Sequence, residues 1–198
     1  MCTPVEYLQS SGGQYINTGI SGNNNNIEIS LKFNLLSYTQ YGGLLGNYNG
    51  EDSNTWRIIH QDSNTTSMWV YPNAKAARSS ATINNITKNA QHTIVYNRSG
   101  ITVDGGDKLS MNIVDGNTNT NNIAIFKSGT TKGAASNLRI YYFKIKDGTS
   151  LIRDFVPVLA PDKTAGKTGV VPAMLDQVNN QVYYNSGTGS FTAGPAVN

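Results

Sequence analysis

The chain has 198 residues, a length that suits one domain with a sizeable core and gives no sign of a second. Only 14% of the residues are charged, and the net charge is +3. The lysines and arginines are scattered, which excludes the basic patch of a nucleic-acid-binding protein. A single cysteine excludes a disulfide framework and a cysteine-based zinc site, and no apolar run is long enough to span a membrane.

Apolar residues alternate with polar ones along most of the chain, which is the period of a β-strand with one solvated face. In residues 27–35, IEISLKFNL, every second side chain is apolar. Residues 55–61 and 67–72 are rich in aromatic and β-branched residues and are separated by DSNTT, a turn composition. We expect these two segments to be paired neighbouring strands.

Three short strands are predicted in residues 92–114, with breaks at residues 97–100 and 104–107. Both breaks contain a glycine at a position where a tight hairpin requires positive φ. A further strand is predicted in residues 122–127, and another in residues 138–147.

In the strand at residues 138–147, LRIYYFKIKD, alternation places Tyr141 on the same face as Phe143 and Ile145. No stretch of ten or more residues has a helical period and a cap, so we expect at most a turn or two of helix. Many short antiparallel strands at close spacing predict an all-β fold, either a two-sheet sandwich or a jelly roll.

Loops are predicted where small and polar residues gather. The asparagine-rich residues 23–26 and 115–122 are expected to be loop tips that face solvent. Residues 128–137, SGTTKGAASN, form the longest stretch of small residues and are a candidate for mobility or for ligand contact.

A charged pair, Arg153 and Asp154, interrupts the apolar strand-forming residues 151–158, LIRDFVPV. Adjacent residues of a strand point to opposite faces, so the two side chains are expected on different sides. A buried Asp154 would need hydrogen-bond donors, which strand neighbours or an arginine can supply. We expect a structural role, in which the pair ties this strand to a loop or a terminus.

Three stretches resemble the concanavalin A-like lectin/glucanase superfamily, and more closely the laminin-G-like modules common in gut-bacterial surface proteins and their phages. They are EYLQSSGGQYINTGI at residues 6–20, LRIYYFKIKDGTSLIRDFVPV at residues 138–158 and MLDQVNNQVYYNSGTGSFTAG at residues 174–194. The resemblance implies a single domain over residues 1–198, a jelly roll of two antiparallel sheets whose N- and C-terminal strands lie side by side. It also implies carbohydrate binding on a concave face or at a loop rim, as in many relatives.

Enzymatic activity is not expected. Glycosidases that resemble this superfamily carry an E-x-D-x-x-E strand with two working carboxylates. The chain has three glutamates, and none begins that pattern: Glu6, Glu28 and Glu51. Both histidines, His60 and His92, lie in strand patterns without a nucleophile motif. The AGKT at residues 165–168 lacks the first glycine of a phosphate loop.

Calcium is the one cofactor that the resemblance leaves open, because some laminin-G-like modules hold it through loop aspartates and carbonyls. Asp104, Asp107 and Asp115 lie near predicted turns. They do not follow the EF-hand spacing, and loop aspartates more often cap turns. We therefore expect no cofactor, with calcium as the alternative and with no metal ligands assigned.

Sugar recognition needs a flat aromatic ring for the apolar face of the sugar and planar polar groups for its hydroxyls. The candidate ligand-binding residues are Trp56, Trp69, Tyr71, Tyr48, Asn49, Arg57 and His60. Trp56 and His60 share one face of their strand while Arg57 and Ile59 share the other, which favours a partly exposed platform. The alternative for each tryptophan is a place in the core of the sandwich.

We therefore expect a non-catalytic, lectin-like module for carbohydrate binding and adhesion at a cell surface or on a phage virion, as a tail or head appendage. The N-terminal MCTPVEYLQS has neither region of a secretion signal, so we expect no signal peptide in this chain. The alternative is a structural virion or surface protein that docks on protein partners or on identical copies. Neither reading involves nucleic acid or insertion into a membrane.

Overall fold

A computed structural model describes residues 1–51, 54–63, 66–73, 81–111 and 118–197, and every regular element in these ranges is a β-strand. In chain order the strands are β1 (Thr3–Pro4), β2 (Leu8–Ser11), β3 (Ile16–Ser21), β4 (Ile27–Leu35), β5 (Gly42–Gly46), β6 (Trp56–His60), β7 (Met68–Pro72), β8 (Ala81–Ile83), β9 (Gln91–Asn97), β10 (Gly100–Val103), β11 (Leu109–Ser110), β12 (Asn122–Ile125), β13 (Ala134–Ala135), β14 (Asn137–Asp147), β15 (Ser150–Pro161), β16 (Val170–Asp176), β17 (Gln181–Tyr183) and β18 (Thr192–Ala193).

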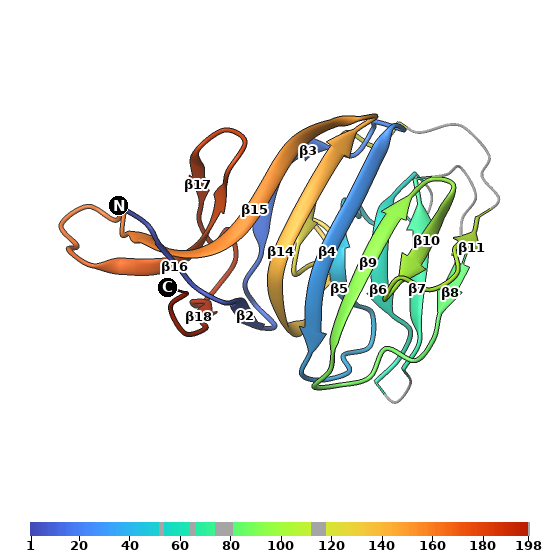
Figure 1. Ribbon diagram of the computed structural model, residues 1–198, viewed down its shortest axis with the longest axis horizontal. Helices are drawn as coiled ribbons and strands as arrows, with labels where there is room; N and C mark the ends of the chain where they lie inside the picture. Colours follow the sequence, from blue (N-terminus) through green and yellow to red (C-terminus); the bar gives the residue numbers. More distant parts are fainter. Residues whose placement is uncertain (52–53, 64–65, 74–80, 112–117, 198) are drawn as a thin grey trace.

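The strands form two sheets, with the long strands β4, β9, β14 and β15 in front of β5 to β8 (Figure 1). The first sheet has the order β11-β10-β9-β4-β14-β15-β16-β17, and β1, β2 and β18 pair beside this path. The second has the order β3-β12-β5-β6-β7-β8. Within the described ranges the pairings are antiparallel, apart from a short parallel pairing of β13 with β5. The expected all-β fold with two antiparallel sheets is confirmed.

The core lies between the sheets and is built by the alternation seen in the sequence. In β4 the apolar side chains from Ile27 to Leu35 are buried, while Glu28, Ser30 and Lys32 are half-buried on the other face. Each large apolar side chain buried in this way contributes roughly 1.5–3 kcal/mol. Tyr96 of β9 also joins the sheets, because its hydroxyl donates a hydrogen bond to the Tyr71 carbonyl in β7.

Strands β6 and β7 pair as the sequence predicts. The positive φ predicted at both hairpin breaks is found at only one of them. Around residues 104–107 the backbone has positive φ at Asp104 (51°) and Gly105 (70°). Gly100 instead lies inside β10 without positive φ, so that part of the expectation is wrong. A Cβ at Gly100 would lie 2.6 Å from the Leu109 carbonyl oxygen, so close strand packing is the reason for this glycine.

The expected position of Tyr141 is also wrong. The register between β14 and β4 shifts between Ile140 and Tyr142, which is the mark of a β-bulge. Phe143 stays in the core, whereas Tyr141 is half-buried and its ring lies 5.3 Å below the ammonium of Lys32, on the polar face of β4. A bulge reverses the alternation locally, and nothing in the strand pattern marks where it occurs.

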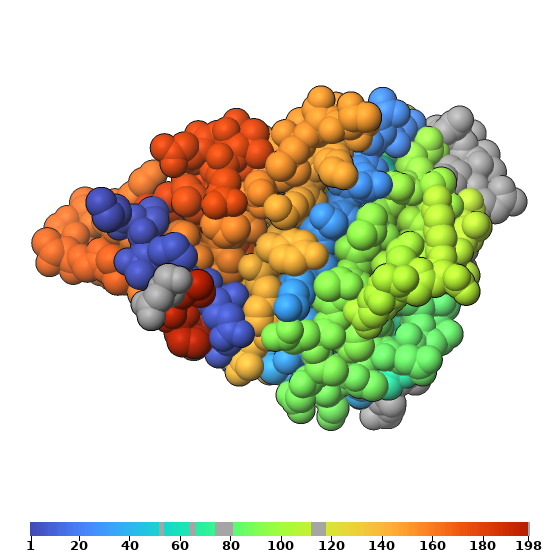
Figure 2. Space-filling model, in the orientation of Figure 1, coloured from blue at the N-terminus to red at the C-terminus, as the bar shows by residue number. Residues whose placement is uncertain are grey.

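The two ends of the chain lie side by side (Figure 1). Val5 forms an isolated antiparallel bridge with Ala196, and β18 pairs with β2. Beside them the hairpin of β15 and β16 projects from the body, as the orange lobe in Figure 2 shows. Its small apolar cluster of Val158, Ala160 and Ala173 is separate from the main core.

Arg153 and Asp154 lie on opposite faces of β15. The Asp154 carboxylate accepts a hydrogen bond from Lys144 Nζ at 2.9 Å. On the other face Arg153 Nε donates to the Thr18 carbonyl oxygen of β3 at 3.2 Å, and it lies 3.6 Å from Asp176 Oδ2. The arginine therefore connects the first sheet to an edge strand of the second.

Asp176 is the fully buried partner that the sequence did not single out. Its Oδ1 accepts hydrogen bonds from the backbone N–H groups of Asp154 (2.9 Å) and Val178 (3.1 Å), and its Oδ2 accepts one from Asn179 Nδ2 (2.9 Å). A buried carboxylate is tolerated when donors and an opposite charge surround it in this way.

We predict that Asp176→Asn lowers the free energy of unfolding by about 3–5 kcal/mol, because it leaves the charge of Arg153 without its buried partner. Asp154→Asn is the matched control, and its loss should be about 1 kcal/mol or less because Lys144 is partly exposed to water. Urea unfolding at neutral pH measures both values. Equal losses in the two variants would contradict the anchoring role of Asp176.

Candidate functional site

Four side chains of β6 and β7 face away from the first sheet and together form the outer face of the second. Arg57 pairs with Tyr71, and Ile59 pairs with Trp69. Their strand neighbours, such as Ile58, are fully buried in the core on the opposite side. The alternation of two adjacent strands thus brings three of the seven predicted ligand-binding residues, Arg57, Trp69 and Tyr71, to one surface.

Arg57 is held between two tyrosine rings, an arrangement that we call the Tyr48–Arg57–Tyr71 stack. Its guanidinium carbon lies 4.2 Å from the centroid of Tyr48 and 4.1 Å from that of Tyr71. Arg57 and Tyr71 are only 5% and 4% exposed, whereas Tyr48 is half-buried and Asn49 is exposed. Cation–π contacts on both faces make this stack a rigid support, of which Tyr48 and Asn49 present the accessible edge.

The accessible aromatic surface is the Tyr41–Trp69 pair. The two rings are stacked, with centroids 6.1 Å apart and planes at 29°. Tyr41 is 50% exposed and Trp69 is half-buried. Tyr41 has a left-handed backbone with φ of 56°, which is costly for a bulky residue, and its N–H donates to the His60 carbonyl at 3.1 Å.

Sequence reasoning missed Tyr41 because it lies in the turn before β5, outside any strand pattern. A bulky aromatic directly before two glycines, in TQYGG, was the signal that could have found it. Turns of this kind carry binding residues more often than the strands that they connect.

Trp56 and His60 point into the protein, so the expectation that they contact a ligand needs correction. Trp56 is fully buried, packs edge-on against Tyr96 with centroids 5.2 Å apart, and donates its indole N–H to the Asn24 carbonyl at 3.3 Å. His60 is 1% exposed and stacks on Tyr38 at 4.7 Å. The same alternation that turns Arg57 outward turns these two inward, and His60 instead supports the turn that carries Tyr41.

The aspartates considered for calcium do not come together in the described residues. The Asp104 carboxylate contacts His92 Nδ1 at 2.8 Å and accepts from the Thr93 N–H at 2.6 Å. Partial burial raises the pKa of Asp104, but these hydrogen bonds outweigh it and hold the pKa below its usual value. Asp107 is exposed, and Asp115 lies outside the described residues. In the part of the chain that the structure describes, no three His, Cys, Asp or Glu side chains cluster as metal ligands.

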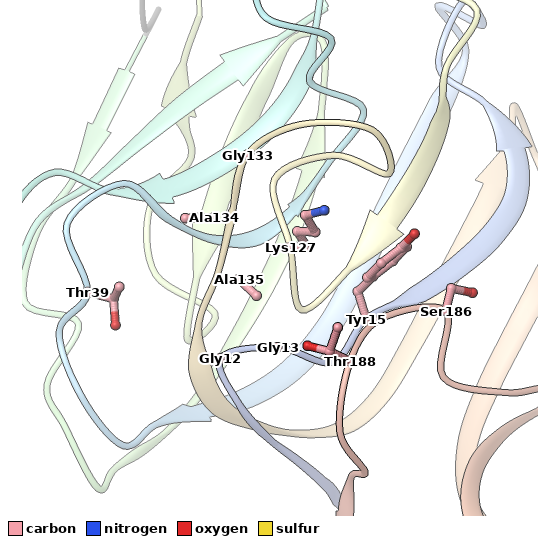
Figure 3. A pocket seen from close by; sticks show the side chains of 11 residues that line it. Gly12, Gly13, Tyr15, Thr39, Lys127, Gly133, Ala134, Ala135, Ser186 and Thr188 are labelled. Atoms are coloured by element: carbon pink, nitrogen blue, oxygen red, sulfur yellow. The ribbon is translucent and has the colours of Figure 1, made fainter.

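A pocket of about 650 Å³ lies where four segments meet (Figure 3). They are the turn between β2 and β3, Thr39 before β5, Lys127 with residues 133–135 after β12, and residues 186–188 near the C-terminus. Part of the small-residue loop that the sequence marked for ligand contact is therefore one wall of this pocket. Its other walls come from segments that are far apart in the chain.

Glycines allow the walls of this pocket to approach. A Cβ at Gly187 would lie 2.1 Å from the Gly13 carbonyl oxygen, and one at Gly133 would lie 2.0 Å from Ser128 Oγ. Asn185 fixes the same region, because its Oδ1 accepts from the N–H groups of Tyr15 (3.2 Å) and Gly187 (2.9 Å). A side chain at Gly187 or Gly133 would therefore push apart the segments that surround the pocket.

We predict that His60 makes stability fall with acidity. Burial lowers the pKa of His60 below its ordinary value of 6.5, although the carbonyl and the charge of Asp62 partly oppose this. Protonation would place a proton on Nε2, which has no hydrogen-bond acceptor among the described residues. The unfolded chain therefore binds the proton first, and stability that is present above pH 6.5 is lost as the pH falls toward the folded-state pKa.

Urea midpoints from about pH 7.5 down to about pH 5 test this linkage. The wild type should lose stability over this range, and His60→Gln should lose clearly less. His92→Gln is the matched control for the other histidine. Identical pH slopes in the wild type and His60→Gln would exclude the effect.

No protein-family model matches the chain, and no curated protein matches it. Among the described residues, no helix is long and apolar enough to cross a membrane. The geometry of the outer face and of the pocket therefore provides the evidence for function.

Proposed function

We propose that the chain is a non-catalytic, lectin-like module of the concanavalin A-like superfamily, which binds carbohydrate at a cell surface or on a phage virion. The observation that carries the proposal is the Tyr41–Trp69 pair, two stacked rings on the outer face of the second sheet with Tyr41 half exposed. Flat aromatic surface of this kind packs against the apolar face of a sugar ring.

The surroundings of the pair support a preformed site. The Tyr48–Arg57–Tyr71 stack lies on the same face, and Tyr41 keeps its left-handed backbone through the bond to the His60 carbonyl. Backbone strain persists only where the surrounding structure enforces it, and it is concentrated at functional sites. Thr82 lies opposite Trp69 in β8 and is exposed, and the exposed amide of Asn49 follows Tyr48, so polar partners for sugar hydroxyls lie on either side.

We propose a binding role rather than catalysis because the three glutamates lie on separate elements. Glu28 faces outward from β4 and pairs with Lys146 Nζ at 3.2 Å, while Glu6 precedes β2 and Glu51 follows β5. A glycosidase needs two carboxylates about 5–9.5 Å apart across one sugar ring.

A second candidate function, docking on protein partners, is favoured by the projecting hairpin of β15 and β16. Val170 is 57% exposed at the start of β16, next to the hairpin tip, and the hairpin carries its own small apolar cluster. Exposed apolar surface on a projecting element is typical of docking sites.

The test is a glycan array probed with the purified chain, with and without calcium. Hits are then titrated with the Trp56→Phe variant, in which Trp69 is the sole tryptophan and reports binding by fluorescence. Trp69→Ala and Tyr41→Ala, followed by calorimetry, should weaken binding about tenfold. Val95→Ala is the matched control, since Val95 is 43% exposed on the polar face of the first sheet and should bind as the wild type does.

If Trp69→Ala and Tyr41→Ala both bind these glycans as tightly as the wild type, the outer face is not the binding site. An array without hits would reject carbohydrate binding. Self-association measured by sedimentation, if lost in Val170→Asp, would then support the docking function.

A further inference from the structure

The described residues that line the pocket carry positive charge only. Among the described residues that line it, Lys127 is the single charged side chain and none is acidic. Lys127 Nζ lies 4.7 Å from the centroid of the Tyr15 ring, and it makes no ion pair or hydrogen bond within the described chain. An ammonium group without a carboxylate partner in a partly enclosed space attracts an anion more strongly than one in open water.

Uncommitted hydroxyl groups accompany this cation. The side-chain hydroxyls of Thr39, Ser186 and Thr188 line the pocket and make no hydrogen bond to the rest of the described chain. In Figure 3, Lys127 and Thr188 lie on one side of the Tyr15 ring and Ser186 lies on the other, with Thr39 at the opposite end of the pocket. The pocket therefore offers hydroxyl groups for hydrogen bonds, the flat apolar ring of Tyr15 and the positive charge of Lys127.

The shape of the pocket suits a compact ligand. Its volume of about 650 Å³ falls within the roughly 300–1,000 Å³ of small-molecule sites. A Cβ at Gly12 would meet no atom within 4 Å, so the space beside this lining residue is open.

We propose that this pocket binds the carboxylate-bearing ring of an acidic glycan, a uronic or sialic acid unit, with Lys127 Nζ pairing with the carboxylate. Tyr15 packs beside the ring, and the three hydroxyls bind those of the sugar. The proposal rests on the proposed carbohydrate-binding function and names the substrate class for a second surface. Thr39 lies two residues before Tyr41, so one turn carries residues of both surfaces.

Calorimetry with the methyl glycosides of glucuronic acid and N-acetylneuraminic acid tests this, with methyl glucoside as the neutral counterpart and inorganic phosphate as the bare anion. At least one acidic sugar should bind about tenfold more tightly than methyl glucoside, and raised salt should weaken it. Lys127→Met should remove this preference and Lys127→Arg should keep it. Lys132→Met is the matched control, because Lys132 belongs to the same loop but does not line the pocket.

Three results would overturn the proposal: no binding of either acidic sugar, acidic-sugar binding that Lys127→Met leaves unchanged, or phosphate binding as tight as that of the acidic sugars. The last would define an anion site without sugar recognition. Any of these three results, found together with neutral glycans that bind through Trp69, would remove the pocket while leaving the proposed function standing. Loss of acidic-sugar binding in Lys127→Met but not in Trp69→Ala would support the pocket as a site separate from the outer face.

Discussion

The carboxylate of Asp176 has no exposed surface, and the donors around it determine how several parts of the chain meet. They come from the backbone of β15, from the turn after β16 and from Arg153, which also contacts the Thr18 carbonyl in the second sheet. A buried charge cannot be left without partners, so these elements must keep their positions together. One of them, β3, follows directly on the turn that lines the pocket, and the buried ion pair therefore supports the walls of the pocket as well as the fold.

In β6 and β7, alternation places one set of side chains in the core and the other set on the outer face. Trp56 and Ile58 fill the interior, while Arg57 on the other side is clasped by two tyrosines. Little further conformational entropy is therefore lost in ordering the outer face, because the strands that carry it are already held by the core. Tyr41 is the exception, since it stands on a strained turn supported by His60.

The sequence predicted what depends on period and composition, and failed where a side chain's direction depends on the fold. The strands at residues 27–35 and the pairing of β6 with β7 follow from local patterns. Alternation groups Trp56 with His60 but cannot say which face meets the other sheet, and the bulge at Tyr141 leaves no trace in the pattern. Asp176 and the pocket depend on segments that are distant in the chain, so a single sequence carries no signal for their meeting.

Because the two ends of the chain lie together, a linker at either end would attach to the same side of the protein. Val5 and Ala196 are bridged, and both ends lie on one side of Figure 1 while β7 and β8 lie on the other. A linker or fusion partner joined to either end would hold the protein by the same side, and a host loop could accept it as an insertion with little separation between the junctions. In each arrangement the part of the second sheet that bears Trp69 would point away from the attached partner and remain exposed to solvent.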